Sequence, residues 1–157
     1  MQMQLPLPSA LAGFAEQLET IREAYHAELR SRPVLSASRA VVDYLTASIA
    51  FNETESMHVL YLDKRNRLIV DDTHSQGTVD FCPVMPREIV KRALLLNASA
   101  IILAHNHPSG DPTPSSADIA MTHKIADACK VLGIDVLDHI IVGKGGHASM
   151  RALRVLS

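Results

Sequence analysis

The sequence predicts an α/β domain in which a mixed β-sheet is flanked by helices. Segments with apolar residues at three- and four-residue steps are interspersed with shorter segments of strand character. Residues 100–104, Ala-Ile-Ile-Leu-Ala, are apolar without interruption, which is typical of a central strand buried on both faces. The 157 residues suit one domain, and 47% hydrophobic with 20% charged residues is an ordinary globular composition.

Residues 1–32 are expected to form an arm and an amphipathic helix ahead of the main domain. Residues 1–8 contain two prolines and no regular pattern. Residues 9–30 carry one apolar stripe at helical spacing, made of Leu11, Phe14, Leu18, Ile21, Tyr25 and Leu29. Pro33 interrupts this pattern, so we expect the main domain to comprise residues 33–157.

The first half of the main domain is expected to contain a helix followed by three strands. Ser36 or Ser38 is a suitable N-cap for the helix. Lys64-Arg65-Asn66 lies between two runs of strand character and indicates a hairpin turn. The helix and the three strands are expected at residues 36–50, 55–63, 67–74 and 77–81.

The second half is expected to arrange helices and strands around the buried strand at 100–104. Pro86 suits the first turn of one helix, and Gly133 suits the end of another. A loop rich in Pro and Gly, residues 105–114, follows the buried strand. The helices are expected at residues 86–97 and 115–132, a strand at 134–142, a turn at 143–146 and a short strand after it.

The charge balance gives no electrostatic footprint for nucleic acid. There are 15 Lys and Arg residues against 17 Asp and Glu residues, a formal net charge of -2. Two local basic clusters are interpreted as solvated surface, because short charge groups on helices and turns usually are. The clusters are Lys64, Arg65 and Arg67, and Arg87, Lys91 and Arg92.

Cysteine usage and the N-terminal residues favour a cytoplasmic protein. Cys82 and Cys129 are far apart and in no paired spacing, so we expect reduced thiols. Residues 1–8 lack a charged region followed by an apolar core, which argues against a secretory signal. No apolar run approaches the ~20 residues that span a membrane, so no membrane contact is expected.

The most informative stretch begins where the buried strand is expected to end. His105 and His107 are two residues apart, so on an extended chain both imidazoles point to one side. Asp118 falls in the first turns of the next helix, which can fold back over the strand end. Zinc accepts two His nitrogens and an Asp oxygen, and three protein ligands leave a fourth position for water. The spacing therefore indicates a zinc site of the catalytic type.

A structural interpretation of the same residues stays open at this point. A lone His-x-His pair is a weak signal for metal. Ser115 and Asp118 also fit the Ser-x-x-Asp pattern of a helix N-terminus, and Thr113 before Pro114 is another candidate cap. Neither capping arrangement prevents Asp118 from binding a metal ion.

The spacing of His105, His107, Pro108, Ser115 and Asp118 resembles the signature of the JAMM metallohydrolases. The string His-Asn-His-Pro-Ser-Gly-Asp-Pro is similar to the RadC branch of that superfamily, and the likeness covers roughly residues 33 to 151. It implies a JAB/MPN-like, cytidine-deaminase-like three-layer fold. Three further segments read like RadC sequences: residues 62–69, 86–89 and 137–143.

The resemblance also implies site roles and one Zn²⁺ per chain. An upstream Glu should hydrogen-bond the attacking water, and the family pattern places it at Glu55, with Glu53 as the alternative. The metal lowers the pKa of its water toward ~7, and Glu55 takes up the proton. Ser115 is the candidate stabiliser of the tetrahedral intermediate.

The remaining histidines are interpreted as structural. Asp138-His139 looks like a catalytic pair, but its place near a buried strand favours a hydrogen-bonded structural histidine. The others have no partners at ligand spacing and are expected to be ordinary surface or half-buried residues. They are His26, His58, His74, His123 and His147.

These expectations lead to one main functional hypothesis and two alternatives. The main hypothesis is a zinc metalloprotease or isopeptidase acting on a peptide or protein. The alternatives are a DNA-repair-associated nucleic-acid-binding protein or nuclease, and a non-catalytic MPN-type scaffold. RadC proteins often carry an N-terminal helix-hairpin-helix module, and the roughly 30 residues before the matched region are too few for it. A homodimer is compatible with all three hypotheses.

Overall fold

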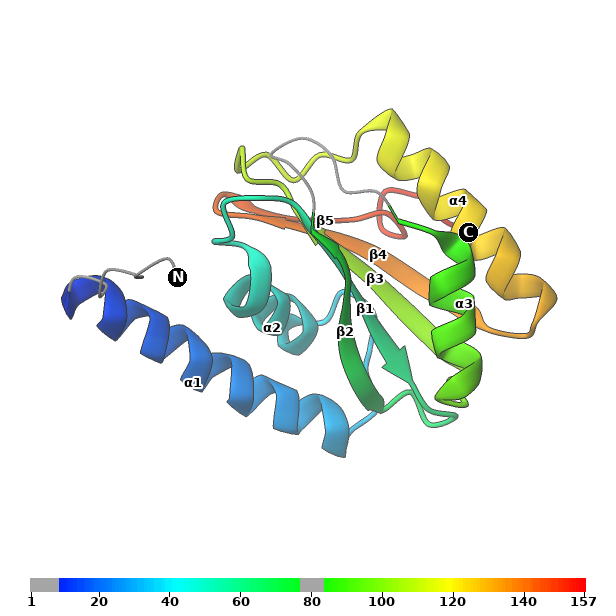
Figure 1. Cartoon of the computed structure of the whole chain (residues 1–157), viewed down its shortest axis with the longest axis horizontal. Helices are drawn as coiled ribbons and strands as arrows, with labels where there is room; N and C mark the ends of the chain where they lie inside the picture. Colours follow the sequence, from blue (N-terminus) through cyan, green and yellow to red (C-terminus); the bar gives the residue numbers. More distant parts are fainter. Residues whose placement is uncertain (1–8, 77–83) are drawn as a thin grey trace, which may run out of the picture.

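The helices and strands are arranged in three layers, with one sheet between two pairs of helices (Figure 1). The computed structural model describes residues 9–76 and 84–157. The strand predicted at 77–81 and Cys82 lie outside these residues. The elements are α1 (Ser9–Ser31), α2 (Arg39–Ile49), β1 (Ser56–Leu62), β2 (Leu68–Gln76), α3 (Pro86–Leu95), β3 (Ala100–Asn106), α4 (Ser116–Val131), β4 (Asp135–Gly143) and β5 (Gly146–Ser149).

The five strands of the described residues form one mixed sheet in the order β2-β1-β3-β4-β5. β3 is the central strand, antiparallel to β1 and parallel to β4. A parallel pair needs a crossover connection, and α4 supplies it between β3 and β4. Residues 100–104 are buried, as the uninterrupted apolar run predicted, and His105 and Asn106 at the end of β3 are buried as well.

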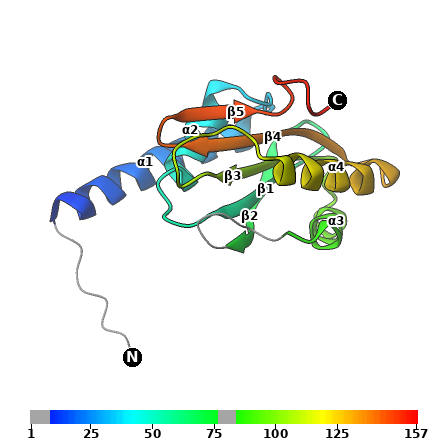
Figure 2. The ribbon, with the colours of Figure 1, turned by 90° about the horizontal axis from the view of Figure 1, so that it is seen from above.

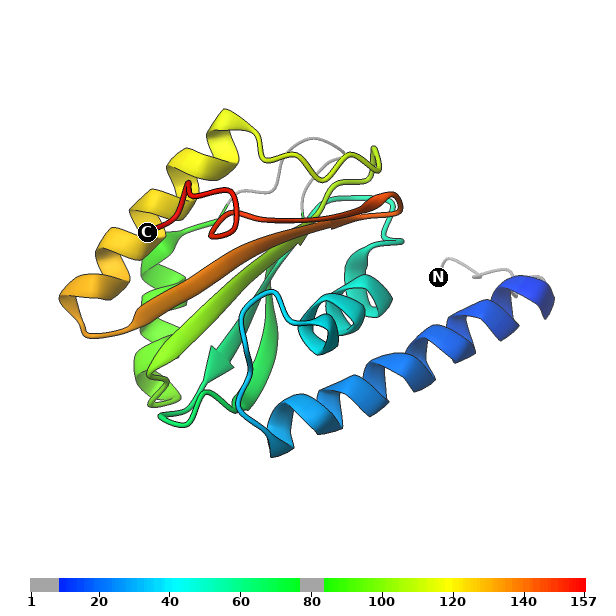
Figure 3. The same cartoon turned by 180° about the vertical axis from the view of Figure 1, so that it is seen from behind.

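Side chains of β3 alternate between two apolar cores. Ile102 and Ala104 pack against α2 and the end of α1, in a cluster that includes Tyr44. Ile101 and Leu103 pack on the other face against α3 and α4. Figures 1 and 3 show the two helix pairs on opposite sides of the sheet. The predicted three-layer α/β class is therefore correct.

Several boundaries differ from the predicted ranges, and two of the differences have a clear physical reason. The second helix begins at Arg39, with Ser38 at the N-cap position, while Ser36 donates its hydroxyl hydrogen bond to Asp138 instead. Strand β3 continues beyond Ala104 to Asn106, because these residues keep the strand pairing to β1 and β4. Their polar side chains are buried with hydrogen-bond partners, so the strand needs no apolar residue there.

One edge of the sheet gathers segments that are distant in sequence. β1 runs antiparallel to β3, so the start of β1 and the end of β3 lie together. The loop after β3 turns back along the sheet to the start of α4 (Figure 2). The C-terminal residues pack beside β4 and α4, with Met150 and Leu156 buried against Ile141 (Figure 3). Among residues 9–76 and 84–157, no helix combines the length and apolarity needed to cross a membrane.

Candidate metal centre

The three predicted ligands meet at this edge of the sheet. His105 is the penultimate residue of β3, His107 follows the strand, and Asp118 lies in the first turn of α4. The two histidine Nε2 atoms are 2.9 Å apart. The Asp118 carboxylate reaches both, with Oδ2 at 3.2 Å from His107 Nε2 and Oδ1 at 3.4 Å from His105 Nε2.

These three side chains are close enough together to hold a metal ion, since one ligand atom from each lies within 4.8 Å of the others. Zinc–ligand bonds of about 2.0–2.2 Å in a tetrahedron place the ligand atoms about 3.3–3.6 Å from one another. The two Nε2 atoms, at 2.9 Å, are closer than that range, while Asp118 Oδ2 at 3.2 Å from His107 and Oδ1 at 3.4 Å from His105 lie near it. Two nitrogens and one carboxylate oxygen also form a donor set that zinc accepts. Within the described residues, His105, His107 and Asp118 form the one group of at least three His, Cys, Asp or Glu side chains that could hold a metal ion.

The far nitrogens of both imidazoles have hydrogen-bond partners that orient the rings. His107 Nδ1 lies 2.8 Å from the main-chain oxygen of Asp111. Because a carbonyl only accepts, Nδ1 carries the proton and the Nε2 lone pair of neutral His107 faces the centre. His105 Nδ1 lies 2.7 Å from Nε2 of His139, which is completely buried.

Burial and neighbouring charges shift the pKa values of His107, Asp118 and His139. A hydrogen bond with Asp118 raises the pKa of His107. Burial raises the pKa of Asp118, but the neighbouring His105 and His107 rings outweigh burial and hold that pKa well below its usual range. Burial lowers the pKa of His139 well below its ordinary value. The site therefore presents a carboxylate to two imidazoles, with a neutral imidazole behind them.

Asp118 is a capping residue and a candidate ligand at once. Ser115 Oγ accepts a hydrogen bond from the Asp118 main-chain nitrogen at 3.0 Å, and Asp118 Oδ2 accepts one from Ser115 N at 2.8 Å. This reciprocal pair is a capping box, so the predicted Ser-x-x-Asp cap is confirmed at Ser115, not at Thr113. The cap stabilises the first turn of α4 and holds the carboxylate toward the histidines.

Glu55 also lies at this edge, directly before β1. Its Oε1 is 4.0 Å from His107 Nε2, and its side chain is largely buried. Glu53, the alternative from the sequence, is exposed. The geometry therefore brings Glu55, and not the side chain of Glu53, into the buried part of the site.

The side chain of Asn106 ties the Glu55 segment to the metal-binding strand. Asn106 is fully buried, and its Oδ1 accepts hydrogen bonds from Ser56 N at 2.8 Å and Ser56 Oγ at 3.1 Å. Its Nδ2 donates to the main-chain oxygens of Asn52 and Thr54 at 3.3 and 3.0 Å. Histidines and asparagine thus alternate along the strand end, and the asparagine holds the residues on both sides of Glu55.

The Asp138 carboxylate and the His139 ring have separate hydrogen-bond partners, although the carboxylate accepts from the main-chain nitrogen of His139 at 2.7 Å. The buried Asp138 carboxylate accepts hydrogen bonds from the hydroxyls of Ser36 and Ser149, both at 2.6 Å. It also accepts from the main-chain nitrogen of Arg151 at 3.0 Å. The His139 ring instead contacts His105 and Thr122. His139 is therefore a hydrogen-bonded, buried histidine, as the sequence indicated. Its contact with the candidate ligand His105 could not be predicted from its position in the sequence.

The other histidines lie away from the three ligands. His58 Nδ1 is 3.1 Å from Asp71 Oδ1, and His74 Nε2 is 2.5 Å from the Tyr61 hydroxyl, so both half-buried rings have hydrogen-bond partners. His123 and His147 are exposed. His26 is half-buried, so the prediction of surface or half-buried positions describes all five of these histidines.

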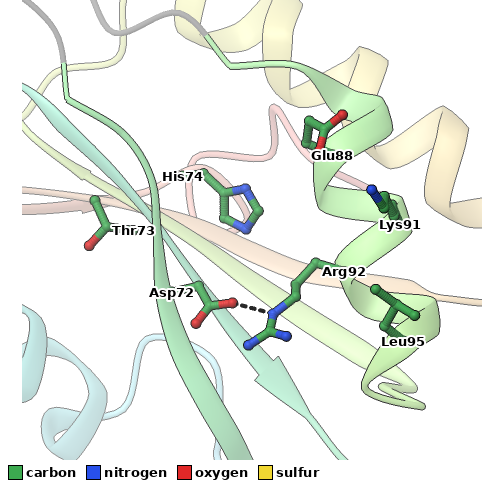
Figure 4. A pocket seen from close by; sticks show the side chains of 7 residues that line it. All are labelled: Asp72, Thr73, His74, Glu88, Lys91, Arg92 and Leu95. Carbon is green, nitrogen blue, oxygen red and sulfur yellow. Dashed lines mark hydrogen bonds and ion pairs between the residues drawn. The ribbon is translucent and has the colours of Figure 1, made fainter.

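The two basic clusters of the sequence occupy different places. Arg92 pairs with Asp72 in a pocket between β2 and α3, where Glu88 and Lys91 also line the wall (Figure 4). The pocket thus mixes both signs of charge. The cluster at residues 64–67 forms the hairpin turn at the other end of β1 from Glu55. With a rise of about 3.3 Å per residue along the strand, this turn is roughly 20 Å from the ligands.

Comparison with known protein families matches residues 35–155 of the chain to the RadC-like JAB domain. The match spans α2 through β5 and so includes Glu55, both histidines, Ser115 and Asp118. It also fits the mixed five-stranded sheet flanked by helices.

Proposed function

Because the chain belongs to the RadC-like JAB domain family, we propose that it is a JAMM-type zinc hydrolase that cuts peptide or isopeptide bonds. The observation that carries the proposal is the triangle of His105 Nε2, His107 Nε2 and the Asp118 carboxylate, with edges of 2.9, 3.2 and 3.4 Å. Three protein ligands at zinc spacing leave the fourth position that a hydrolytic site needs.

His105, His107 and Asp118 would hold one Zn²⁺ per chain. A bound Zn²⁺ acts as a Lewis acid that polarises a carbonyl oxygen and lowers the pKa of water. The far nitrogens of both imidazoles and the Asp118 carboxylate have hydrogen-bond partners within the protein. These bonds keep the three side chains directed toward the position of the metal ion. Such engagement of the far imidazole nitrogens is usual around metal-binding histidines.

Glu55 would serve as the general base and then as the general acid. Its carboxylate takes a proton from the attacking water and returns that proton to the leaving amine. Two features support this role: Oε1 lies 4.0 Å from His107 Nε2, and Asn106 fixes the main chain on both sides of Glu55. A carboxylate held in place beside the ligands can transfer a proton without first ordering a loop.

Ser115 would donate a hydrogen bond to the oxyanion of the tetrahedral intermediate. In the capping box its hydroxyl accepts from Asp118 N, which leaves the hydroxyl proton as a donor. The start of α4 adds the positive end of a helix dipole, which favours negative charge near this point. The cap and the proposed catalytic role therefore use different atoms of the same hydroxyl group.

A peptide or isopeptide substrate fits the surroundings better than a nucleic acid. The basic turn at residues 64–67 is roughly 20 Å from the ligands along β1, too far to hold a phosphate next to the reacting group. The cluster on α3 is partly neutralised, because Arg92 pairs with Asp72. The formal net charge of -2 adds no general attraction for phosphates.

The decisive experiment compares Glu55→Gln with Glu53→Gln. Zinc per chain is measured by mass spectrometry, and turnover is measured on fluorogenic peptides and on lysine isopeptides. We expect Glu55→Gln to fold and to keep one zinc, while turnover falls about 10²–10⁴-fold because the proton acceptor is lost. The exposed Glu53→Gln variant should retain wild-type zinc content and turnover.

Two results would contradict the proposal. A folded wild-type chain that takes up no zinc would remove the metal centre. A Glu55→Gln variant with wild-type turnover would show that Glu55 is not the general base. Zinc binding without turnover on any peptide or isopeptide would instead favour the non-catalytic scaffold.

A further inference from the structure

Two buried side chains, His139 and Thr122, form a hydrogen-bonded series behind His105. His105 Nδ1 is 2.7 Å from His139 Nε2, and His139 Nδ1 is 2.6 Å from Thr122 Oγ1. Thr122 Oγ1 is in turn 2.6 Å from the main-chain oxygen of Asp118, one turn earlier in α4. The series therefore begins at one candidate ligand and ends on the main chain of another.

The chemistry of these groups determines where each proton lies. A carbonyl oxygen only accepts, so the single hydroxyl proton of Thr122 goes to the Asp118 oxygen. Thr122 must then accept from His139 Nδ1–H. A neutral imidazole with its proton on Nδ1 has its lone pair on Nε2, so His139 accepts from His105 Nδ1–H. His105 is left with its lone pair on Nε2, the atom that faces His107 and Asp118.

With the opposite order of protons, His105 Nε2 would carry a proton and could not bind a metal ion. A charged His139 would donate from Nε2 and place the proton of His105 on the atom that should bind metal. The surroundings disfavour this charged form, because the His139 ring is completely buried and its hydrogen-bond partners are an imidazole and a hydroxyl. The neighbouring Asp138 carboxylate accepts from the Ser36 and Ser149 hydroxyls and from the main-chain nitrogen of His139, and not from the His139 ring.

We infer that His139 and Thr122 are positioning residues that hold the His105 imidazole in its Nδ1–H tautomer, with Nε2 free to bind the metal ion. The inference rests on the metal site of the proposed function and deepens it. His107 reaches the same tautomer by a shorter route, through the main-chain oxygen of Asp111 in its own loop. The tautomer of His105 depends instead on His139 of β4 and Thr122 of α4, so the packing of these two elements against β3 determines which nitrogen of His105 carries the proton.

The tautomer itself can be observed in the metal-free protein. Long-range ¹H–¹⁵N correlation spectra at alkaline pH distinguish a proton on Nδ1 from one on Nε2. We expect the assigned His105 ring of the wild type to carry Nδ1–H. Thr122→Val removes the hydroxyl at nearly constant shape, so His139 loses its acceptor and the His105 ring should shift toward the Nε2–H form.

Zinc affinity gives the second readout, by competition with a chromophoric chelator. His139→Phe removes the acceptor of His105, and we expect affinity to fall about 10–100-fold, the usual effect of losing such a partner. His139→Gln places an amide oxygen near the position of Nε2 and should restore most of the affinity and the Nδ1–H tautomer. Recovery by His139→Gln would not follow from a role in packing alone.

The results separate this inference from the proposed function. An Nε2–H tautomer of His105 in the wild type would overturn the inference, as would a folded His139→Phe protein with unchanged tautomer and zinc affinity. If His139→Phe fails to fold, the wild-type and Thr122→Val spectra decide. A wild-type chain with Nδ1–H, sensitive to Thr122→Val but without zinc affinity, would support the positioning role and refute the metal centre.

Discussion

The two ends of strand β3 are equally buried but differ in what they bury. The apolar end, Ala100–Ala104, contributes side chains to the two cores on either face of the sheet. The polar end, His105 and Asn106, has side chains that are 1% and 0% exposed. Each polar side chain at this end has several hydrogen-bond partners from other segments. One strand thus ends in a buried polar network directly beside the candidate ligands.

The difference shows how one strand can serve stability and chemistry separately. Apolar contacts are non-directional, and their contribution depends on area and volume. Buried polar groups are stable only with partners in specific directions, so a network also fixes orientation. We therefore expect changes at the apolar end to alter mainly the free energy of unfolding. Changes at the polar end should alter mainly the site.

The largest expected effect on stability is at the apolar end. Ile102→Ala leaves a cavity beside α2 and should lower the free energy of unfolding by about 2–5 kcal/mol. Urea unfolding measures this loss, and zinc affinity of the folded variant should stay at the wild-type value. A parallel fall in zinc affinity would show that the two ends of β3 are not separable.

The next effect is at the polar end. Asn106→Ala removes the bonds to Ser56 N, Asn52 O and Thr54 O, and a buried group left unpaired costs about 1–3 kcal/mol. Because the Glu55 segment is released while both histidines stay, turnover per bound zinc should fall more than zinc affinity. Ser56→Ala is the control, since it removes the two bonds of the Ser56 hydroxyl, with Asn106 Oδ1 and Asn52 Nδ2, and leaves the bonds of Asn106 to the main chain. Loss of zinc with unchanged turnover per zinc would contradict the assignment.

A smaller effect is expected where the metal-binding loop touches the sheet. A Cβ on Gly143 would lie 2.6 Å from the main-chain oxygen of Gly110, in the loop that orients His107. Gly143→Ala should displace this loop and cost about 1 kcal/mol, or about fivefold in zinc affinity. Gly145→Ala, whose Cβ would lie 3.2 Å from the same oxygen, should have less effect. Equal affinities for the two variants would contradict the steric argument.

The smallest effect needs no substitution. The hydrogen bond with Asp118 raises the pKa of His107, and Glu55 adds to this rise. In the metal-free chain the ion pair of protonated His107 with Asp118 stabilises the fold at pH values below the pKa that His107 has in the unfolded chain. This contribution is lost as the pH rises through the higher pKa of His107 in the folded chain. Zinc must displace the same proton, so below that folded pKa its affinity should fall about tenfold per pH unit. Calorimetry in buffers of different ionisation enthalpy measures the released proton, and pH-independent affinity would contradict the prediction.

Much of the fold was predictable because its signals are local. The stripe of α1, the hairpin turn at residues 64–66 and the apolar run of β3 each depend on neighbours within a few residues. Boundaries were harder where tertiary contacts replaced local rules. Strand β3 extends to Asn106 because distant segments satisfy its polar side chains, and no pattern within the strand could indicate those partners.

The sequence by itself determined which side chains are available to the site. The two-residue step between His105 and His107 and the Ser-x-x-Asp step to Asp118 follow from strand and helix periodicity. Only the tertiary structure decided which atoms of these side chains are free to act. His139 lies 34 residues from His105, and the crossover through α4 brings it and Thr122 against that ring. Proton positions depend on hydrogen bonds between such distant residues, and hydrogen bonds require a geometry that spacing along a chain does not contain.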